Sequence, residues 1–322
     1  MKTKMKTNHA LCGLISGLLS RTLFTPLLVV AALFAAPAAV HAGLMYVSSG
    51  SQSVVQVSAS GVVSPFATVS ANSTPWGIAV ASSGNVFVTE PSTGLIREIT
   101  PGGAVSTFAT LGGGSNPLGM TIDGSGNLYV AHNGSPTNRT IDKITIGGTI
   151  STYATMASSF NPYNVAFDSS GNLYAGGNNN GTNNQIVKIS PTQVVSDFKS
   201  SLAGAPNGLA LDASGNLYTT FGTNTITKIT PGGVVSTFAT LPGGSAALGL
   251  AFDSLGFLYS ANQSANTISK ISADGLTVTT FASAITNPRY IAFAPVAVPE
   301  PGTALFGIAC VGVSAFRRRR RA

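Results

Sequence analysis

Two side chains capable of acid–base chemistry occupy equivalent positions in neighbouring repeats of this sequence. Glu90 lies three residues after Phe87, and His132 lies three residues after Tyr129. A carboxylate and an imidazole held side by side can serve as a general acid–base pair, because both exchange protons near neutral pH. No second acid, cysteine or Ser/His/Asp set accompanies them, so an enzyme is the less favoured interpretation.

A metal site is the second chemistry to consider. Four aspartates begin turns such as "DGSGN" and "DSSGN", namely Asp123, Asp168, Asp212 and Asp253. A calcium loop of the EF-hand type continues to a bidentate acid in its last position, which none of these segments has. Aspartates that accept hydrogen bonds within a tight hairpin explain the spacing instead. The sequence therefore predicts neither a metal nor a cofactor.

These residues belong to repeats that must position them. "PGGAVSTFAT" at 101–110 returns as "PGGVVSTFAT" at 231–240, and looser copies lie around the pair. Each repeat holds four short runs rich in Val, Ile, Thr and aromatic residues, separated by Gly, Pro, Asn and Ser. Four-stranded units repeating roughly every 40–45 residues predict a β-propeller. Lysines recur on the third run, and we interpret them as part of a solvated outer strand: Lys143, Lys188, Lys228 and Lys270.

Two motifs count the blades. An aromatic residue on the second run occurs six times, at Tyr46, Phe87, Tyr129, Tyr174, Tyr218 and Tyr259. A first-run motif, usually Pro-x-Gly-apolar-Ala-apolar, begins at Pro75, Pro117, Pro162, Pro206, Ala247 and Pro288. The first repeat lacks its first strand, and the last repeat, "PRYIAFA", consists of that strand alone. We predict an all-β fold over 43–295: a six-bladed β-propeller of four-stranded antiparallel blades, whose first blade is closed by the C-terminal strand.

One repeat position varies where its neighbours are uniform. It follows the first residue of each first-strand motif and holds Trp76, Leu118, Tyr163, Asn207, Leu248 and Arg289. Propeller geometry places these residues around one mouth of the central channel. Trp76 beside Tyr163, Asn207 and Arg289 would offer a stacking surface with hydrogen-bonding groups, which suits a sugar ring. The competing interpretation is that Trp76 is a packed plug in the channel mouth.

The sequence motifs of the repeats resemble those of known families. "DSSGNLYAGG", "DASGNLYTT" and "GNVFVTEPSTGLIREITPGG" are similar to NHL-type repeats and to streptogramin-lyase and gluconolactonase-like propellers over residues 43–295. Such propellers include enzymes and passive binders. The resemblance implies, for the lyases, a His and Glu residues near magnesium and, for the lactonases, a divalent metal held by carboxylates and an Asn at the channel mouth. Here that face offers one carboxylate with Asn164 and Asn207, a sparse set for a hard cation.

Three functional interpretations follow. The favoured one is a binding or structural module, because the Asn-rich loops "NGSPTNR", "GGNNNGTNNQ" and "ANQSAN" supply neutral hydrogen-bonding groups of the kind that sugars use. A matrix component with solvated loops and no discrete ligand is equally compatible with these loops. The alternative is a lyase or lactonase-type enzyme with a metal site at the channel mouth.

Residues 1–42 are predicted to be a signal peptide. Basic residues precede the apolar run "LFTPLLVVAALFAAPAAV", and "VHA" ending at Ala42 places small residues at the usual cleavage positions. An uncleaved N-terminal membrane anchor is the alternative, although Pro26 and Pro37 interrupt the run.

Residues 296–322 have three parts in order. The triplet Pro299, Glu300 and Pro301 precedes an apolar stretch of 14 residues, 303–316, and five arginines. This tail resembles the PEP-CTERM sorting signal of Gram-negative bacteria. The resemblance implies export, transient anchoring in the inner membrane, cleavage by an exosortase and release to the cell surface or extracellular matrix. A plain C-terminal membrane anchor is the alternative.

The net charge of +7 comes from the ends of the chain. Residues 43–295 contain eight basic and nine acidic residues, a net charge of −1. A basic patch able to follow phosphates is therefore missing, and nucleic acid is excluded as a partner. The expected partners are the exosortase, the secretion machinery and extracellular polysaccharide. Both cysteines, Cys12 and Cys310, lie outside the predicted propeller, so it does not depend on disulfides.

Overall fold

The computed structural model describes residues 43–71, 73–112, 115–134, 139–157, 159–181 and 183–295. The predicted signal peptide (1–42), the sorting segment (296–322) with Pro299, Glu300 and Pro301, and both cysteines lie outside the described residues. Within these ranges, no helix has the length and apolar character that crossing a membrane would require.

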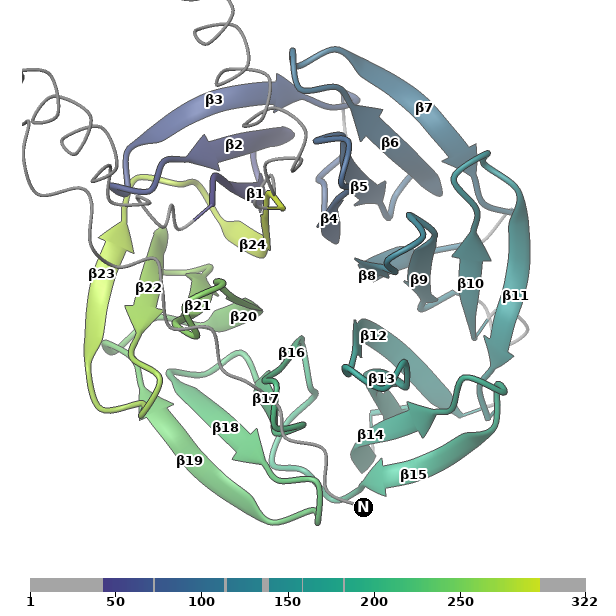
Figure 1. Ribbon diagram of the computed structural model, residues 1–322, viewed down its shortest axis with the longest axis vertical. Coiled ribbons are helices and arrows are strands. Elements are labelled where there is room, and N and C mark those ends of the chain that lie inside the picture. The colour runs from purple at the N-terminus through teal and green to yellow at the C-terminus, as the bar shows by residue number, and fades with distance from the viewer. Residues whose placement is uncertain are drawn as a thin grey trace, which may run out of the picture. The chain divides into compact units, whose positions relative to one another are not determined.

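The described chain forms 24 strands in six four-stranded antiparallel sheets, arranged as a ring of blades (Figure 1). Blade 1 contains β24 (Pro288–Phe293), β1 (Met45–Ser49), β2 (Ser53–Val57) and β3 (Val63–Thr68). Blade 2 contains β4 (Ile78–Val80), β5 (Val86–Glu90), β6 (Leu95–Ile99) and β7 (Val105–Thr110). Blade 3 contains β8 (Pro117–Ile122), β9 (Leu128–His132), β10 (Thr140–Ile144) and β11 (Ile150–Thr155).

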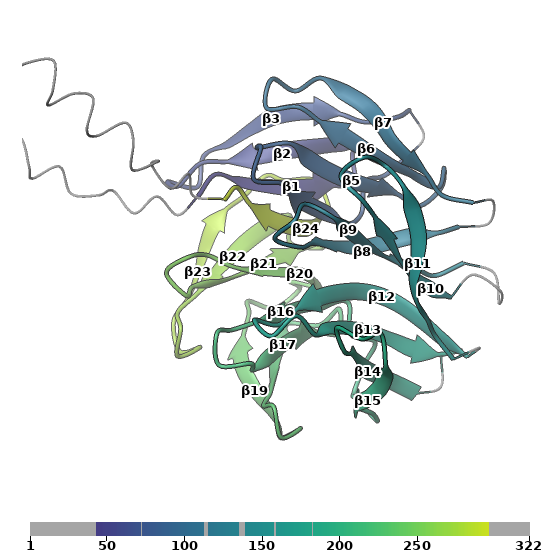
Figure 2. The same ribbon diagram turned by 45° about the vertical axis from the view of Figure 1, so that its right-hand side comes forward.

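Blade 4 contains β12 (Phe160–Phe167), β13 (Leu173–Asn179), β14 (Asn183–Ile189) and β15 (Val195–Lys199). Blade 5 contains β16 (Gly208–Leu211), β17 (Leu217–Thr220), β18 (Thr225–Ile229) and β19 (Val235–Thr240). Blade 6 contains β20 (Ala247–Phe252), β21 (Leu258–Asn262), β22 (Thr267–Ile271) and β23 (Val278–Ala282). Fourth strands such as β7 and β11 lie on the outside of the ring (Figure 2). The predicted six-bladed propeller is confirmed.

The ring closes through the last described strand. β24 pairs antiparallel with β1, with Met45 opposite Phe293 and Val47 opposite Ile291. Tyr290 and Ile291 of β24 are both 6% exposed. Blade 1 therefore takes its innermost strand from the far end of the chain, as predicted.

Repeated aromatic residues hold neighbouring blades together. Tyr129 on a second strand meets Tyr153 of its own fourth strand edge-on, with ring centroids 4.9 Å apart. The same ring contacts Phe167 on the first strand of the next blade at 4.8 Å. Tyr218 and Tyr259 repeat this pattern of contacts. The decapeptide is repeated because its aromatic residue packs against the second-strand aromatic residue of the same blade.

The two faces of the propeller differ. The mouth face carries the starts of the first strands and the loops between second and third strands, such as residues 91–94. The opposite face carries the turns between first and second strands, such as residues 123–127. The described chain begins and ends at this opposite face, where Gly43 lies against the backbone of Ala294.

The aspartates of the opposite face are hairpin residues. Asp123 accepts hydrogen bonds from the backbone N–H groups of Ser125 and Asn127, both at 2.9 Å, and from the amide of Asn127 and the hydroxyl of Tyr129. Burial alone would raise the pKa of Asp123, but these four donors hold it below its ordinary value. Asp168, Asp212 and Asp253 accept the corresponding backbone bonds. The hairpin interpretation is confirmed.

The recurring lysines are not outer-strand residues. They lie on third strands, covered by a fourth strand, and each ammonium approaches an aromatic ring of the second strand. Nζ of Lys143 is 5.4 Å from the centroid of Tyr129, and Nζ of Lys228 is 5.6 Å from that of Tyr218. The interpretation as an outer strand that discourages edge pairing was wrong, because the fourth strand is the outer edge of each blade. Cation–π contact with the second-strand aromatic residue accounts for the lysine position instead.

Candidate functional site

Glycines bring the six first strands close together around the channel. A Cβ on Gly77 would lie 2.3 Å from the carbonyl oxygen of Leu118, and one on Gly249 would lie 2.5 Å from that of Arg289. The third position of the first-strand motif is therefore glycine because the neighbouring backbone occupies the space of a side chain. Asn164 and Tyr290 replace this glycine in blades 4 and 1.

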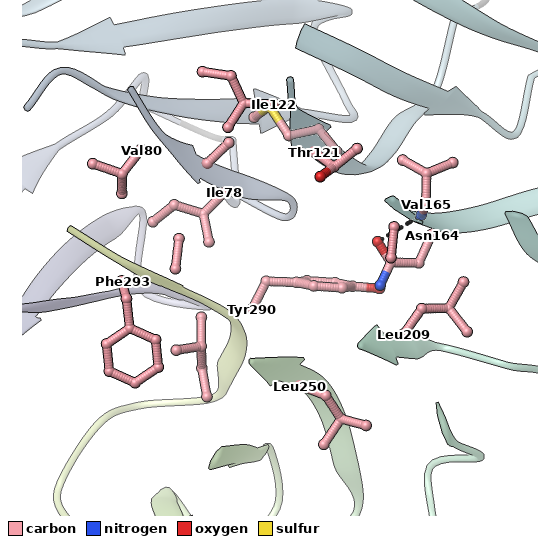
Figure 3. A pocket seen from close by; sticks show the side chains of 15 residues that line it. Ile78, Val80, Thr121, Ile122, Asn164, Val165, Leu209, Leu250, Tyr290 and Phe293 are labelled. Carbon is pink, nitrogen blue, oxygen red and sulfur yellow. Dashed lines mark hydrogen bonds between the residues drawn. The ribbon is translucent and has the colours of Figure 1, made fainter. Parts of the chain in front are cut away.

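Tyr290 extends into the channel and bridges it. Its hydroxyl donates a 2.6 Å hydrogen bond to the backbone carbonyl of Asn207, which lies just before β16 in blade 5. Burial raises the pKa of Tyr290 above its ordinary value, so the phenol stays protonated and remains a donor. Figure 3 shows Tyr290 reaching from β24 toward Asn164. The adjoining cavity of about 210 Å³ is lined mostly by apolar residues such as Ile78, Leu209 and Leu250.

Trp76 and Arg289 form a stacked pair at the mouth. Cζ of Arg289 lies 4.0 Å from the indole ring, which places the cation over one face of Trp76. The indole also tilts against Tyr290, with ring centroids 6.4 Å apart. Both side chains are half-buried. Burial lowers the pKa of Arg289, but a guanidinium retains its charge at any physiological pH. We call Trp76, Tyr163, Asn207 and Arg289 the mouth cluster.

The other two members of the mouth cluster present polar groups. Tyr163 on β12 is half-buried, and its hydroxyl accepts a 2.7 Å hydrogen bond from the side-chain amide of Asn178, which leaves its own proton available. Asn207 is also half-buried, and its backbone carbonyl holds Tyr290. The structure thus brings Trp76 against Arg289 and links Asn207 to them through Tyr290. It gives Tyr163 a partner in its own blade.

Glu90 is committed to contacts around it. The side chain is fully buried at the end of β5. Its carboxylate accepts hydrogen bonds from the backbone N–H and hydroxyl of Ser70 at 3.0 and 2.9 Å, and from the hydroxyl of Thr93 at 3.1 Å. Nε of Arg97 completes the set at 3.2 Å as an ion pair. This carboxylate therefore ties three segments of the mouth face together.

His132 has a different partner. It ends β9, as Glu90 ends β5, but its Nε2 lies 3.6 Å from a carboxylate oxygen of Asp142 on β10. His132 is 3% exposed, and this nitrogen makes no hydrogen bond. Among the described residues, no hydrogen bond or ion pair joins Glu90 to His132. The equivalent strand positions expected from the sequence are present, while an acid–base pair between them is not formed.

Metal-ligating side chains are dispersed. Within the described ranges, no three His, Cys, Asp or Glu residues lie close enough together to hold one ion. Asn164, which the sequence places near a first-strand start, is buried, and its side-chain oxygen accepts a bond from the N–H of Val165.

His132 should make the stability of the propeller depend on pH. Burial lowers its pKa below the ordinary value of 6.5, although Asp142 opposes the shift, so folding favours the neutral ring. The free energy of unfolding should be constant above about pH 6.5 and fall below it, by at most about 1.4 kcal/mol per pH unit, until the folded-state pKa is passed. Urea denaturation between pH 5 and 7 measures this. His132→Asn should remove the slope, and an equal slope in both proteins would refute the assignment.

Comparison with known proteins supports the fold. No protein-family model and no curated protein matches the sequence. A streptogramin B lyase shares the fold with 20% identity and a TM-score of 0.58, over 80% of this chain and 89% of that one. A gluconolactonase from Xanthomonas campestris has 15% sequence identity and a TM-score of 0.57, over 67% of this chain and 78% of that one. A chain of a nidogen/laminin complex has 18% identity and a TM-score of 0.65, over 79% of this chain and 98% of that one. Likeness at these identities shows the propeller fold that the repeats indicated.

Proposed function

We propose that this protein is an exported propeller that binds exopolysaccharide at the cell surface or in the extracellular matrix, through the mouth cluster. The observation that carries the proposal is the stack of Arg289 on Trp76 above a channel bridged by Tyr290. Tyr290 follows Arg289 in β24 and its ring also meets Trp76, so the stack and the bridging phenol lie together at the mouth. Half-buried aromatic and polar groups that lie side by side are typical of sugar-binding surfaces.

The stack with Arg289 gives Trp76 a role other than that of a channel plug. Because Arg289 covers one indole face, Trp76 both packs and positions a polar group, and Tyr290 is the residue that fills the channel. Hydroxyl and amide groups of Tyr163 and Asn207 lie at first-strand starts on the same face. These groups supply the hydrogen-bonding partners that sugar hydroxyls need.

A lyase or lactonase activity has weaker support. The neighbours of known structure share only the fold with this chain. Glu90 is saturated with donors, and His132 faces Asp142 in its own blade. The carboxylate of Glu90 is fully buried and His132 is only 3% exposed, so neither side chain is placed to reach a substrate at the channel mouth.

The two ends of the sequence support the export part of the proposal. Residues 1–42 have the composition of a signal peptide, and 296–322 have the triplet, apolar stretch and arginine run of an exosortase-sorted tail. The protein would be held transiently in the inner membrane of a Gram-negative bacterium and then released. Released material should begin near Gly43 and end close to Pro299. Intact-mass measurement tests this, and an extracellular species that retains residues 317–321 would contradict it.

Trp76→Ala tests the binding part. We expect a free-energy loss of roughly 2 kcal/mol, below the 3–5 kcal/mol typical of a fully buried aromatic residue, together with loss of retention by the organism's own exopolysaccharide. Affinity electrophoresis beside a melting curve measures both. Leu276→Ala, at an 83% exposed position of the opposite face, is the matched control and should change neither. Equal mobility of Trp76→Ala and the unaltered chain would remove Trp76 from the site.

A further inference from the structure

Arg289 is a cation for which the described protein provides no acceptor. It makes no ion pair and no hydrogen bond with any described residue, and its one close partner is the face of Trp76. Nε is fully buried without a partner, whereas both Nη atoms, also unbonded, retain some exposure. A half-buried guanidinium normally finds a carboxylate or carbonyl oxygen, because unpaired buried donors are costly.

The other arginines on this face show the contrast. Arg97 donates to Glu90 and Thr107, and also to the hydroxyl of Ser70. Arg139 donates one bond, of 2.9 Å, to the side-chain oxygen of Asn180, while its Nε and Nη1 are buried without a partner. Among the described arginines, Arg289 is therefore the one whose guanidinium makes no hydrogen bond within the protein, so a bound ligand could supply all of its acceptors.

The stack fixes the direction of these free donors. With Cζ only 4.0 Å from the indole ring, Arg289 is held over Trp76 at the rim of the channel. Its backbone carbonyl packs against Gly249 of the neighbouring first strand, and Tyr290 next in sequence is anchored to Asn207. Both the side chain and the backbone of Arg289 are therefore positioned before any ligand arrives, which reduces the entropy lost on binding.

The charge distribution favours an anion at this mouth. On the mouth face, Glu90 is paired with Arg97, and Asp142 lies in blade 3 beside His132. Five other acids sit in turns of the opposite face: Asp123, Asp168, Asp212, Asp253 and Asp274. Arg289 thus attracts an approaching anion without a competing carboxylate beside it.

We propose that Arg289 anchors the carboxylate of an acidic sugar residue, so that the polysaccharide bound at the mouth is one that carries uronate groups. This inference rests on the proposed function. A guanidinium offers two parallel N–H donors that match the two oxygens of a carboxylate. Tyr163 and Asn207 then meet hydroxyl groups of the same chain.

The test compares three probes with the full chain: alginate, which is a polyuronate, neutral dextran, and dextran sulfate. We expect retention by alginate and little by dextran. Arg289→Gln should weaken binding to alginate by about 10- to 100-fold, the effect of one charge-assisted bidentate contact. Arg289→Lys should weaken binding to alginate less than Arg289→Gln does, because lysine keeps the charge but not the bidentate geometry. Lys228→Gln removes the same charge on the opposite face and should bind normally.

The outcomes separate this inference from the proposed function. Equal retention by dextran and alginate, unaffected by Arg289→Gln, would overturn the anion site and leave a neutral-glycan module. Arg289-dependent binding of dextran sulfate at the same strength would overturn the uronate assignment. Absence of retention by every polysaccharide, including the organism's own, would overturn the proposed function itself. Melting curves of both Arg289 variants must match that of the unaltered protein, and a large loss of stability would count against the site.

Discussion

Deleting Pro288–Ala294 is expected to abolish cooperative unfolding of the propeller. The deletion removes β24, and with it the ladder from Met45↔Phe293 to Ser49↔Pro288. It also takes away buried Tyr290 and Ile291. Burial of each such side chain is worth about 1.5–3 kcal/mol, and the exposed edge of β1 adds the cost of unpaired backbone groups. Set against a domain stability of roughly 5–15 kcal/mol, the loss should leave an aggregating protein.

Removing residues 296–302 instead is the control, because it shortens the chain by the same length and leaves all 24 strands of the described residues in place. Thermal and urea unfolding followed by circular dichroism compare the two proteins. A shortened chain without β24 that melts like the control, with one sharp transition, would contradict closure of blade 1 by the C-terminal strand.

Replacing Glu90 by Ala should cost about 3–5 kcal/mol, which is typical when one partner of a buried ion pair is lost. The change strips acceptors from the backbone of Ser70, the hydroxyl of Thr93 and Nε of Arg97. The side chain of Arg97 is 19% exposed, so water can replace only part of the hydrogen bonding that its guanidinium loses. Denaturant unfolding at neutral pH gives the free energy directly.

Glu98→Ala is the matched control in the same blade. Glu98 is half-buried on the neighbouring strand β6 and accepts a 2.6 Å hydrogen bond from the amide of Asn85. Its loss should cost about 1 kcal/mol, the usual worth of one hydrogen bond. Equal, small losses for Glu90→Ala and Glu98→Ala would show that Glu90 is not structural and would reopen its assignment as a catalytic acid.

The fold followed from the sequence because every blade repeats the same local chemistry. Second-strand aromatics and first-strand Pro-x-Gly motifs are fixed in spacing by hairpins, so counting them gave six blades and the split first blade. Positions around the ring were equally predictable. Trp76 and Arg289 lie 213 residues apart, yet the closure of blade 1 beside blade 2 makes them neighbours.

The contacts that decide the site were less accessible from sequence. Tyr290 and Asn164 occupy the glycine position of their motifs, and that break in the pattern was a signal of side chains entering the channel. Glu90 and His132 each meet the third-strand residue at the same register position, Arg97 opposite Val88 and Asp142 opposite Val130. The residue type at that position therefore decides the partner, although the two intervening loops differ in length. Rotamers, which place Arg289 over the indole, leave no trace in a single sequence.

The pairing of β1 with β24 also sets the order in which the molecule can be completed. Four consecutive strands build each of blades 2 to 6, so these can form as their segments become available. Blade 1 must wait, because Ser48 and Tyr290, joined by a hydrogen bond, stand 242 residues apart. When the chain emerges N-terminus first, from a ribosome or through a pore, one edge of β1 stays unpaired until Phe293 has emerged. The interval of greatest vulnerability is therefore governed by the speed of delivery, and crowding by other copies during that interval invites exchange of β24 between chains.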